Sequence, residues 1–358
     1  MEGQETGILA VCFDGDSFHK RIGPALMKWG LISDSDNRCR CFGPNFLTFR
    51  LESPIRKSQL EEVRSMPGAR RTAMIDPRGM VVRRNGQPDI VVPLSDSVRV
   101  GGPEAVIIAG PCGVESESQI CEIAEAVKEA GASALRGGAF KPRTSPYSFA
   151  GLRERGLEYL ALARERTGLP IVTEALEPED LDVVARYADA IQIGARNMQN
   201  FPLLFKAGQH PSGKPVLLKR GFGSTIDEFL QAAEYILIGR FCAERENTGL
   251  ILCERGIRTY EQATRFMLDV GAFPVLKERS PFPVIADPSH PAGNRAYVPA
   301  MARAAVAAGA DGLLIEVHTD PDRAWSDGAQ TMDTRAFRRL AEEIRHIAEL
   351  RPAAPLPR

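Results

Sequence analysis

The pattern that most constrains this chain is an alternation of short apolar runs with amphipathic stretches, which begins at Ala105. The runs that we expect to form strands are residues 105–111, 134–140, 170–176, 190–195, 215–221, 249–256, 283–290 and 312–318. Helical patterns separate them, including residues 118–131, 156–168, 177–188, 225–237 and 298–310, and residues 334–350 form the last helical pattern. Several of these patterns end at a glycine, the residue that a left-handed helix cap favours. Eight such units in roughly 250 residues predict an α/β fold, a TIM (β/α)8 barrel.

A doubly wound parallel sheet is the rival arrangement of the same elements. Such a sheet is expected to carry a glycine-rich nucleotide fingerprint after its first strand. The chain has AGPCGVES at that place, which is not such a fingerprint. We therefore prefer the barrel, and we expect its catalytic groups where the strands run into the loops that follow them.

The first hundred residues have a different pattern. Residues 7–13, 38–42, 46–52 and 70–76 predict strands, and residues 17–31 and 56–66 predict helices. This βαββαβ order is typical of a small α+β ferredoxin-like domain. The stretch that follows predicts a hairpin with its turn at Asn85 and Gly86, and then a linker. We therefore expect a ferredoxin-like domain at residues 1–98 and a catalytic barrel at residues 99–358.

Charge and cysteine content exclude several classes of protein. The 45 basic and 46 acidic residues nearly cancel, so no overall field attracts nucleic acid or an anionic membrane. No apolar run approaches the roughly 18 to 20 residues of a membrane helix, and the first residues lack the pattern of a signal peptide. The 7 cysteines are scattered, and their odd number cannot be fully paired within one chain. We expect reduced thiols and a cytoplasmic location.

Charged or ligand-forming residues lie at the C-terminal end of nearly every expected strand. They are Cys112, Arg136, Lys141, Arg143, Glu174, Arg196, Lys219, Arg220, Arg255, Arg258, His290 and Glu316. One such arginine is more often part of a loop salt bridge, but many cations on one rim repel each other unless anions lie between them. The pattern therefore predicts phosphorylated or carboxylated substrates. A nucleic-acid groove is disfavoured because few aromatic residues lie between the cations.

A second group of residues predicts a metal site. Cys112, His290, Glu316 and Asp327 follow or belong to the first, seventh and eighth expected strands, which are neighbours in a closed barrel. Taken singly, the cysteine is more often a core thiol and the histidine a loop hydrogen-bond partner. Together they form a mixed donor set that suits a divalent transition ion. His318 shares the strand face of Glu316 and is a reserve ligand or a supporting group.

At these residues the sequence resembles a known family. The strings that carry the likeness are AGPCGVES, LRGGAFKPRTSPYSF, QIGARNMQNF, KPVLLKRG, ILCERGIRTYE, DPSHPAG and IEVHTDPDRAWSDG. They resemble the short type I class of 3-deoxy-D-arabino-heptulosonate 7-phosphate (DAHP) synthases, which is related to 3-deoxy-octulosonate 8-phosphate synthases. The likeness covers about residues 104–350. Some members of the class carry a ferredoxin-like N-terminal domain that mediates feedback inhibition by aromatic amino acids, and tetramers are common among them.

The resemblance implies a metal-dependent transferase that condenses phosphoenolpyruvate with erythrose 4-phosphate and water, giving DAHP and phosphate. This is the first step of the shikimate pathway to the aromatic amino acids. The implied phosphoenolpyruvate contacts are Arg136, Lys141, Arg196, Lys219 and Arg255. Arg143 and Thr144 would meet the phosphate of the aldose. Cys112, His290, Glu316 and Asp327 match the metal ligands, with Asp327 also beside the substrate. Lys141 and His290 are the candidate catalytic residues, and Lys141 is the candidate for proton transfer.

Alternatives remain open at this point. The ion could be manganese, cobalt, iron or zinc. Related metal-independent octulosonate synthases carry asparagine in place of the cysteine, so the presence of Cys112 implies metal dependence. The string KPRT favours the seven-carbon product, because octulosonate synthases resemble KANRTS there. Gly113, Ala150 and Thr319 depart from the usual pattern, so a synthase for another phosphorylated aldose, including one of secondary metabolism, stays possible. A non-catalytic regulatory barrel would have lost ligands, yet all are present. We expect a homo-oligomer, tetramer or dimer, and an aromatic amino acid effector.

Overall fold

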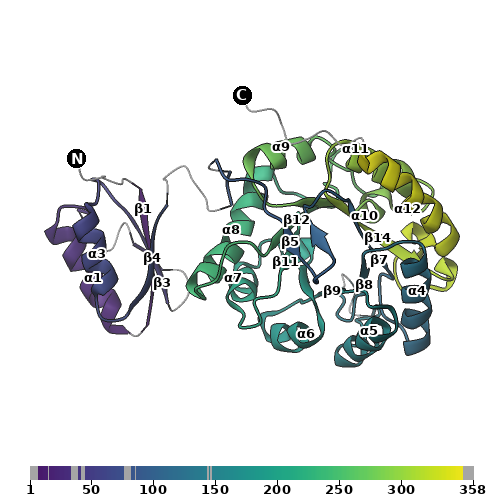
Figure 1. Cartoon of the computed structure of the whole chain (residues 1–358), viewed down its shortest axis with the longest axis horizontal. Helices are drawn as coiled ribbons and strands as arrows, with labels where there is room; N and C mark the ends of the chain where they lie inside the picture. Colours follow the sequence, from purple (N-terminus) through teal and green to yellow (C-terminus); the bar gives the residue numbers. More distant parts are fainter. Residues whose placement is uncertain are drawn as a thin grey trace.

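The computed structural model describes residues 7–14, 16–33, 39–41, 45–75, 82–84, 86–142, 145 and 147–349. Within them, a small sheet with two helices lies beside a much larger barrel (Figure 1). No helix in these ranges is both long and apolar enough to cross a membrane.

All eight expected barrel strands are present. They are β7 (Val106–Gly110), β8 (Ala134–Arg136), β9 (Ile171–Glu174), β10 (Ala190–Ile193), β11 (Val216–Lys219), β12 (Leu250–Glu254), β13 (Val284–Ala286) and β14 (Gly312–His318). Consecutive strands pair in parallel, and β14 pairs with both β13 and β7, so the sheet closes on itself. The prediction of a TIM barrel is confirmed, and the carboxyl ends of all eight strands meet at one rim.

Helices surround this barrel. They are α4 (Glu117–Glu129), α5 (Glu154–Thr167), α6 (Leu181–Tyr187), α7 (Phe201–Gln209), α8 (Ile226–Cys242), α9 (Ala272–Arg279), α10 (Ser289–Ala292), α11 (Val298–Ala307) and α12 (Thr334–Glu349). Local chemistry sets several of their ends. The Ser116 hydroxyl caps α4 by accepting the Gln119 N–H, and Thr225 and Glu228 form a capping box on α8. Gly168 ends α5 in the left-handed conformation, at a φ of 72°.

A short hairpin fills the N-terminal end of the barrel. Its strands are β5 (Val92–Pro93) and β6 (Arg99–Val100), and Val92, Leu94 and Val100 pack among the inward-facing residues of the strands. The prediction of a hairpin turn at Asn85 and Gly86 is wrong. Asn85 lies outside the described residues, but residues 86–91 form no strand and the antiparallel pair comes later. The turn forms instead where Leu94 N–H donates to the Val98 carbonyl.

The N-terminal unit has the expected βαββαβ order. Its elements are β1 (Ile8–Phe13), α1 (Asp16–Lys28), β2 (Cys39–Cys41), β3 (Phe46–Arg50), α3 (Lys57–Ser65) and β4 (Ala69–Ile75). The strands form an antiparallel sheet in the order β2-β3-β1-β4, as in a ferredoxin-like fold. Because side chains alternate along a strand, Leu9, Val11 and Phe13 of β1 face the two helices.

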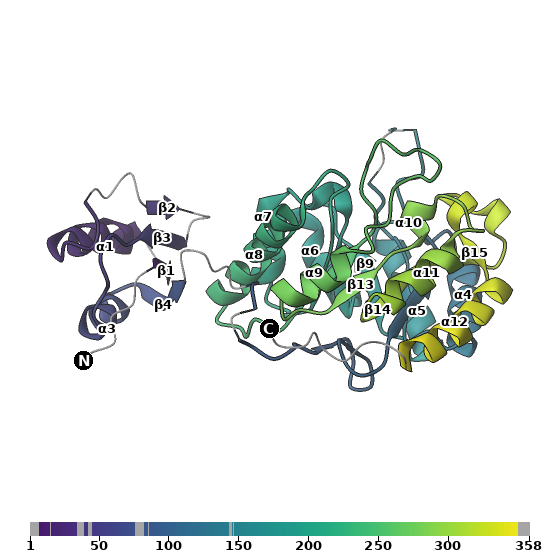
Figure 2. The ribbon, with the colours of Figure 1, turned by 90° about the horizontal axis from the view of Figure 1, so that it is seen from above.

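The other face of this sheet packs on the barrel. Ala10 and Cys12 of β1 join one apolar cluster with Phe241 and Cys242 at the end of α8. Arg71 of β4 adds polar contacts, since its guanidinium donates to the Phe241 carbonyl at 3.1 Å. Figures 1 and 2 show the sheet between its own helices on one side and α7 and α8 on the other.

The described residues between the two units pack against the barrel. Val82 lies in the barrel's hydrophobic core, and its N–H donates to the Glu234 carboxylate at 2.9 Å. Arg84 donates to the Lys277 carbonyl in α9. The division at residues 98 and 99 remains a prediction.

Candidate active site

A cavity of about 270 Å³ opens at the rim where the barrel strands end. Its lining residues are Arg136, Lys141, Pro142, Ser145, Ser148, Glu174, Gln192, Gly194, Ala195, Arg196, Lys219, Arg255, Arg265, His290 and Asp327. The loops or ends of seven strands therefore contribute, as the barrel topology predicts. Cations dominate the charged part of this lining.

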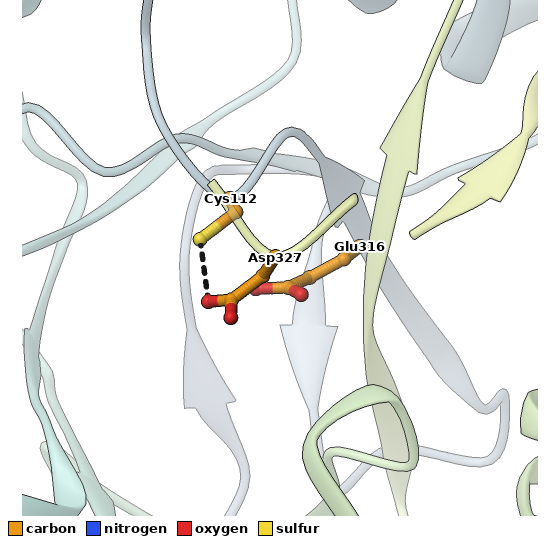
Figure 3. Close-up of side chains that lie close together, drawn as sticks. All are labelled: Cys112, Glu316 and Asp327. Atoms are coloured by element: carbon orange, nitrogen blue, oxygen red, sulfur yellow. Dashed lines mark hydrogen bonds between the residues drawn. The ribbon is translucent and has the colours of Figure 1, made fainter. Parts of the chain in front are cut away.

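A thiol and two carboxylates converge beside the cavity. Cys112 follows β7, Glu316 lies within β14, and Asp327 lies in the loop that follows β14. One ligand atom from each lies within 4.8 Å of the others, and the Cys112 thiol donates to Asp327 Oδ2 at 3.1 Å (Figure 3). Asp327 has a positive φ of 53°, a backbone conformation that aspartate tolerates better than most residues. The three expected ligands of this set are thus brought together.

Electrostatics keep both carboxylates charged, although Glu316 is buried and Asp327 is half-buried. Burial by itself raises the pKa of Glu316, but the nearby His290 and Arg136 hold it below its usual value. In the same way burial opposes ionisation of Asp327, while His290, the Cys112 hydrogen bond and Arg265 lower its pKa to about 2. Burial and the neighbouring Glu316 raise the pKa of Cys112 to about 12, so the free thiol carries its proton.

His290 lies at the edge of this cluster. Its Nε2 is 3.8 Å from Glu316 Oε1, whereas its Nδ1 is 2.6 Å from Asp287 Oδ2. It is not within 4.8 Å of all three other ligand atoms. Burial lowers the pKa of His290, which favours the neutral ring that a metal ligand requires. Sulfur, nitrogen and two carboxylates are the donor set of a mixed transition-metal site, so these residues fit a divalent ion.

His318 does not join the cluster. Its Nδ1 accepts the Asp320 N–H at 2.9 Å, and its Nε2 lies 3.8 Å from a Glu115 carboxylate oxygen. The expectation of a reserve ligand is therefore not met, and a supporting role on the Glu115 side is what its contacts allow.

Some of the cations hold carboxylates. Arg136 donates to Glu316 Oε1 at 2.9 Å, and Lys219 donates to Asp287 Oδ2 at 2.5 Å, both deep in the protein. Lys141 instead approaches the cysteine, with its Nζ 2.8 Å from the Cys112 carbonyl and 2.9 Å from Sγ. These contacts orient the three cations around the cluster.

Other cations have no carboxylate partner among the described residues. Arg196 and Arg255 both line the cavity, and neither has an acidic oxygen within 4.0 Å in these parts of the chain. Arg255 is only 4% exposed, and its Nη1 is buried without a hydrogen-bond partner. An unpaired buried guanidinium is costly unless an anion binds it. This arrangement is therefore suited to an anionic substrate.

Not every residue that the strand ends suggested lies in the cavity. Arg220 is not among the residues that line it and donates to Glu254 and Asp269, each at 2.8 Å. Glu174 lines the cavity and accepts from Gln192 Nε2 at 3.1 Å. Arg143 and Thr144 lie outside the described residues.

Sequence reasoning missed three contributors. Asp287 joins Lys219 to His290, Arg265 donates to Asp327 Oδ1 at 3.2 Å, and Gln330 donates to Glu316 Oε2 at 2.6 Å. Asp287 could have been found, because it directly follows a strand. Arg265 and Gln330 lie in loops, and no periodicity indicates where those loops run.

Comparison with known proteins shows the family to which the chain is similar. Residues 87–351 match the DAHP synthetase I family. The chain is 51% identical, over 77% of its length and 79% of the relative's, to phospho-2-dehydro-3-deoxyheptonate aldolase of Thermotoga maritima. It is 33% identical, over 70% of its length and 95% of the relative's, to 2-dehydro-3-deoxyphosphooctonate aldolase of Desulfatibacillum aliphaticivorans.

A solved structure resembles nearly the whole chain. The crystal structure of phospho-2-dehydro-3-deoxyheptonate aldolase (DAHP synthase) from Thermotoga maritima covers 96% of this chain and 98% of its own. The TM-score is 0.72 and the sequence identity is 40%. The likeness therefore includes the N-terminal unit as well as the barrel. With the family match spanning most of the chain, the protein belongs to the DAHP synthetase I family.

Proposed function

We propose that the cavity binds phosphoenolpyruvate and an aldose phosphate next to each other and condenses them beside a divalent metal ion. Family membership makes the chain a DAHP synthase, a transferase of aromatic biosynthesis whose substrates are phosphoenolpyruvate and erythrose 4-phosphate. The observation that carries the assignment of the site is the meeting of unpartnered cations with the Cys112, Glu316 and Asp327 cluster at one rim.

Cys112, Glu316 and Asp327 would hold the metal ion, with His290 as the fourth ligand. The mixed sulfur, nitrogen and oxygen donors favour manganese, cobalt, iron or zinc over magnesium, which prefers oxygen ligands. When bound, such an ion can polarise the aldehyde oxygen or orient a water molecule. Asp287 supports the set from outside, since it lies 2.6 Å from His290 Nδ1 and so orients the ring.

The cations bind and orient phosphoenolpyruvate. Arg196 and Arg255 have free donors for its phosphate and carboxylate oxygens, and Arg136, Lys141 and Lys219 lie around the same cavity. Both substrates are anions that repel each other in water. The arginines and lysines offset that repulsion and fix the distance between the reacting carbons.

The reaction forms a carbon–carbon bond and a carbon–oxygen bond, and it breaks the bond between carbon 2 and the phosphate oxygen. Carbon 3 of phosphoenolpyruvate attacks the aldehyde carbon, and the aldehyde oxygen takes a proton to become a hydroxyl. Water adds to carbon 2, and its oxygen becomes the ketone oxygen as phosphate leaves with the electron pair of the carbon–oxygen bond. The two protons of this water pass to the departing phosphate and to solvent. Lys141, which lies against the cluster and lines the cavity, is placed to give the proton to the aldehyde oxygen. His290 would act as a metal ligand in this step, with its Nδ1 held beside Asp287.

Arg143 and Thr144 would bind the phosphate of the aldose, as the KPRT string implies. A synthase for a five-carbon aldose is the alternative, because relatives at 33% identity carry the octonate name. Purified enzyme with manganese and phosphoenolpyruvate should release phosphate fastest with erythrose 4-phosphate. A clear preference for arabinose 5-phosphate would assign the alternative, and no release with any aldose would refute the synthase.

Further properties belong to the same proposal. We infer that residues 1–98 regulate the barrel in response to an aromatic amino acid, and that the enzyme works as a tetramer or dimer. A cytoplasmic location agrees with the free thiols of Cys12, Cys112, Cys121, Cys242 and Cys253. A thiol ligand such as Cys112 requires that reduced state. Inhibition assays with tyrosine and phenylalanine, and light scattering for the oligomer, test these inferences.

A further inference from the structure

Two phenylalanine rings stack beside the active-site cavity. Phe222 lies in the loop after β11, and Phe266 lies in the long loop after β12. Their ring centroids are 5.8 Å apart and their planes differ by 19°. Both are half-buried, and the reaction described above gives neither ring a role. We call this pair the Phe222–Phe266 platform.

Arginine side chains lie over the platform. The Cζ atom of Arg255 is 4.4 Å from the Phe266 centroid and 5.7 Å from the Phe222 centroid. Arg258 lies 4.9 Å and Arg196 lies 5.9 Å from the Phe222 centroid. A guanidinium is attracted to the face of an aromatic ring within about 6 Å, and the attraction grows where water is excluded. Arg255 with Phe266 is therefore the strongest of these contacts.

Arg265 also lies over Phe266, with its Cζ 5.7 Å from the ring centroid, and it pairs with Asp327. For the other arginines on the platform, the rings take the place of the carboxylates that hold cations nearby. Arg136 and Lys219 are paired with Glu316 and Asp287, which neutralise them. In the described parts of the chain, Arg196, Arg255 and Arg258 have no acidic oxygen within 4.0 Å. A ring attracts a guanidinium without cancelling its charge, so the arginine stays available to an anion.

Arg255 shows why such support is needed. Its side chain is almost wholly buried and Nη1 has no hydrogen-bond partner. Burial and the neighbouring Arg265 oppose its charge and lower its pKa, although Asp287 at longer range acts in the other direction. Without a favourable contact, a buried cation would turn toward solvent or toward a carboxylate. The two rings hold it at the cavity wall instead.

We propose that Phe222 and Phe266 are positioning residues for phosphoenolpyruvate. They hold Arg255 and Arg196 at the cavity wall, with Arg258 beside them, so that the charges meet the phosphate and carboxylate oxygens of this substrate. The inference rests on the proposed function, because it takes phosphoenolpyruvate as the anion. It assigns to the rings an effect on the binding of this substrate and not on that of the aldose.

The test compares phosphoenolpyruvate binding to manganese-loaded wild-type enzyme and variants by isothermal titration calorimetry. Phe266→Leu and Phe266→Met keep an apolar side chain but remove the ring, and each should raise the Kd about tenfold, or about 1.4 kcal/mol. Phe266→Tyr keeps the ring face and should stay within about twofold of wild type. Phe222→Leu should act in the same direction as Phe266→Leu. Tyr260→Leu is the matched control, because that ring is in the same loop and 95% exposed.

Steady-state kinetics and thermal unfolding of the same variants separate positioning from packing. The KM for phosphoenolpyruvate should rise while kcat, the KM for erythrose 4-phosphate and the melting temperature change little. An unchanged Kd in Phe266→Leu and Phe266→Met would overturn the proposal, as would an equal loss in Phe266→Tyr or a parallel loss of aldose affinity. Failure of the wild-type enzyme to bind phosphoenolpyruvate would instead refute the proposed function.

Discussion

Replacing Asp287 by asparagine tests whether this buried carboxylate stabilises the barrel by offsetting the positive charge of Lys219. The Asp287 carboxylate is fully buried and accepts from Lys219 Nζ at 2.5 Å, and it lies 2.6 Å from His290 Nδ1. Its second oxygen accepts the His290 backbone N–H at 3.2 Å. Asparagine keeps the shape and one oxygen acceptor. It removes the negative charge that Lys219, only 4% exposed, faces.

The size of the effect follows from these contacts. Removing one partner of a buried ion pair costs about 3–5 kcal/mol, because the other charge is left uncompensated. The amide oxygen still accepts a hydrogen bond, so we expect the lower end, about 3 kcal/mol. With about 2–4 °C per kcal/mol for a unit of this size, the melting temperature of the barrel should fall by roughly 6–12 °C.

Differential scanning calorimetry of a double-mutant cycle checks this reasoning. Lys219→Met removes the buried ammonium, so Asp287→Asn should cost at least about 1 kcal/mol less in that background than in wild type. Asp322→Asn is the control, because Asp322 pairs with Arg295 at a side-chain exposure of 82% and should cost less than about 1 kcal/mol. Strictly additive losses from Asp287→Asn and Lys219→Met would refute the argument that an uncompensated charge is the cause.

Three other outcomes are expected. Cys112→Ala should leave the barrel folded but lower metal affinity and turnover about 100-fold or more, because one of four ligands is lost. Metal analysis and phosphate release measure these effects, and full activity would contradict the metal assignment. Arg143→Ala should raise the KM for erythrose 4-phosphate about tenfold and leave the Kd of phosphoenolpyruvate within about twofold, as expected of a charged hydrogen bond to one substrate; equal loss of both would contradict it. Removing residues 1–81 should leave an active barrel that tyrosine and phenylalanine no longer inhibit. Removing residues 1–98 should also lower the melting temperature, because Val92 and Leu94 then no longer fill the end of the barrel. Inhibition that persists after removal of residues 1–81 would count against regulation by the N-terminal unit.

The barrel could be predicted from the sequence because each strand is a separate apolar run. β7 and β14 show this most clearly, since every residue of both is buried. The β5–β6 hairpin could not be predicted in the same way. Its strands are two residues long, and its turn is held by a few local hydrogen bonds, among them the Val98 N–H donated to the Ser95 hydroxyl. The Asn-Gly pair at residues 85 and 86 is a stronger local turn pattern, but no strands flank it among residues 82–84 and 86–91.

Part of the candidate site could also be predicted, for a topological reason. Parallel strands bring their carboxyl ends to one rim. Cys112 and Glu316 therefore meet, although 203 residues lie between them in the sequence. Which cation pairs with which carboxylate could not be predicted. Arg136 ends β8 and Arg255 directly follows β12, yet the first is neutralised by Glu316 and the second lies on two rings. That difference depends on side-chain geometry that periodicity does not encode.

The closure of the barrel through β7 and β14 also affects how the chain emerges from the ribosome. These strands pair Val106 with Gly312, so about 200 residues must be synthesised between them. At a synthesis rate of about 5–20 residues per second, one edge of β7 stays unpaired for roughly 10–40 seconds until β14 has been made. An apolar strand with an unpaired edge can pair with other chains. Nascent chains stopped before residue 312 should therefore aggregate or remain bound to chaperones, while chains that include β14 are released as folded enzyme.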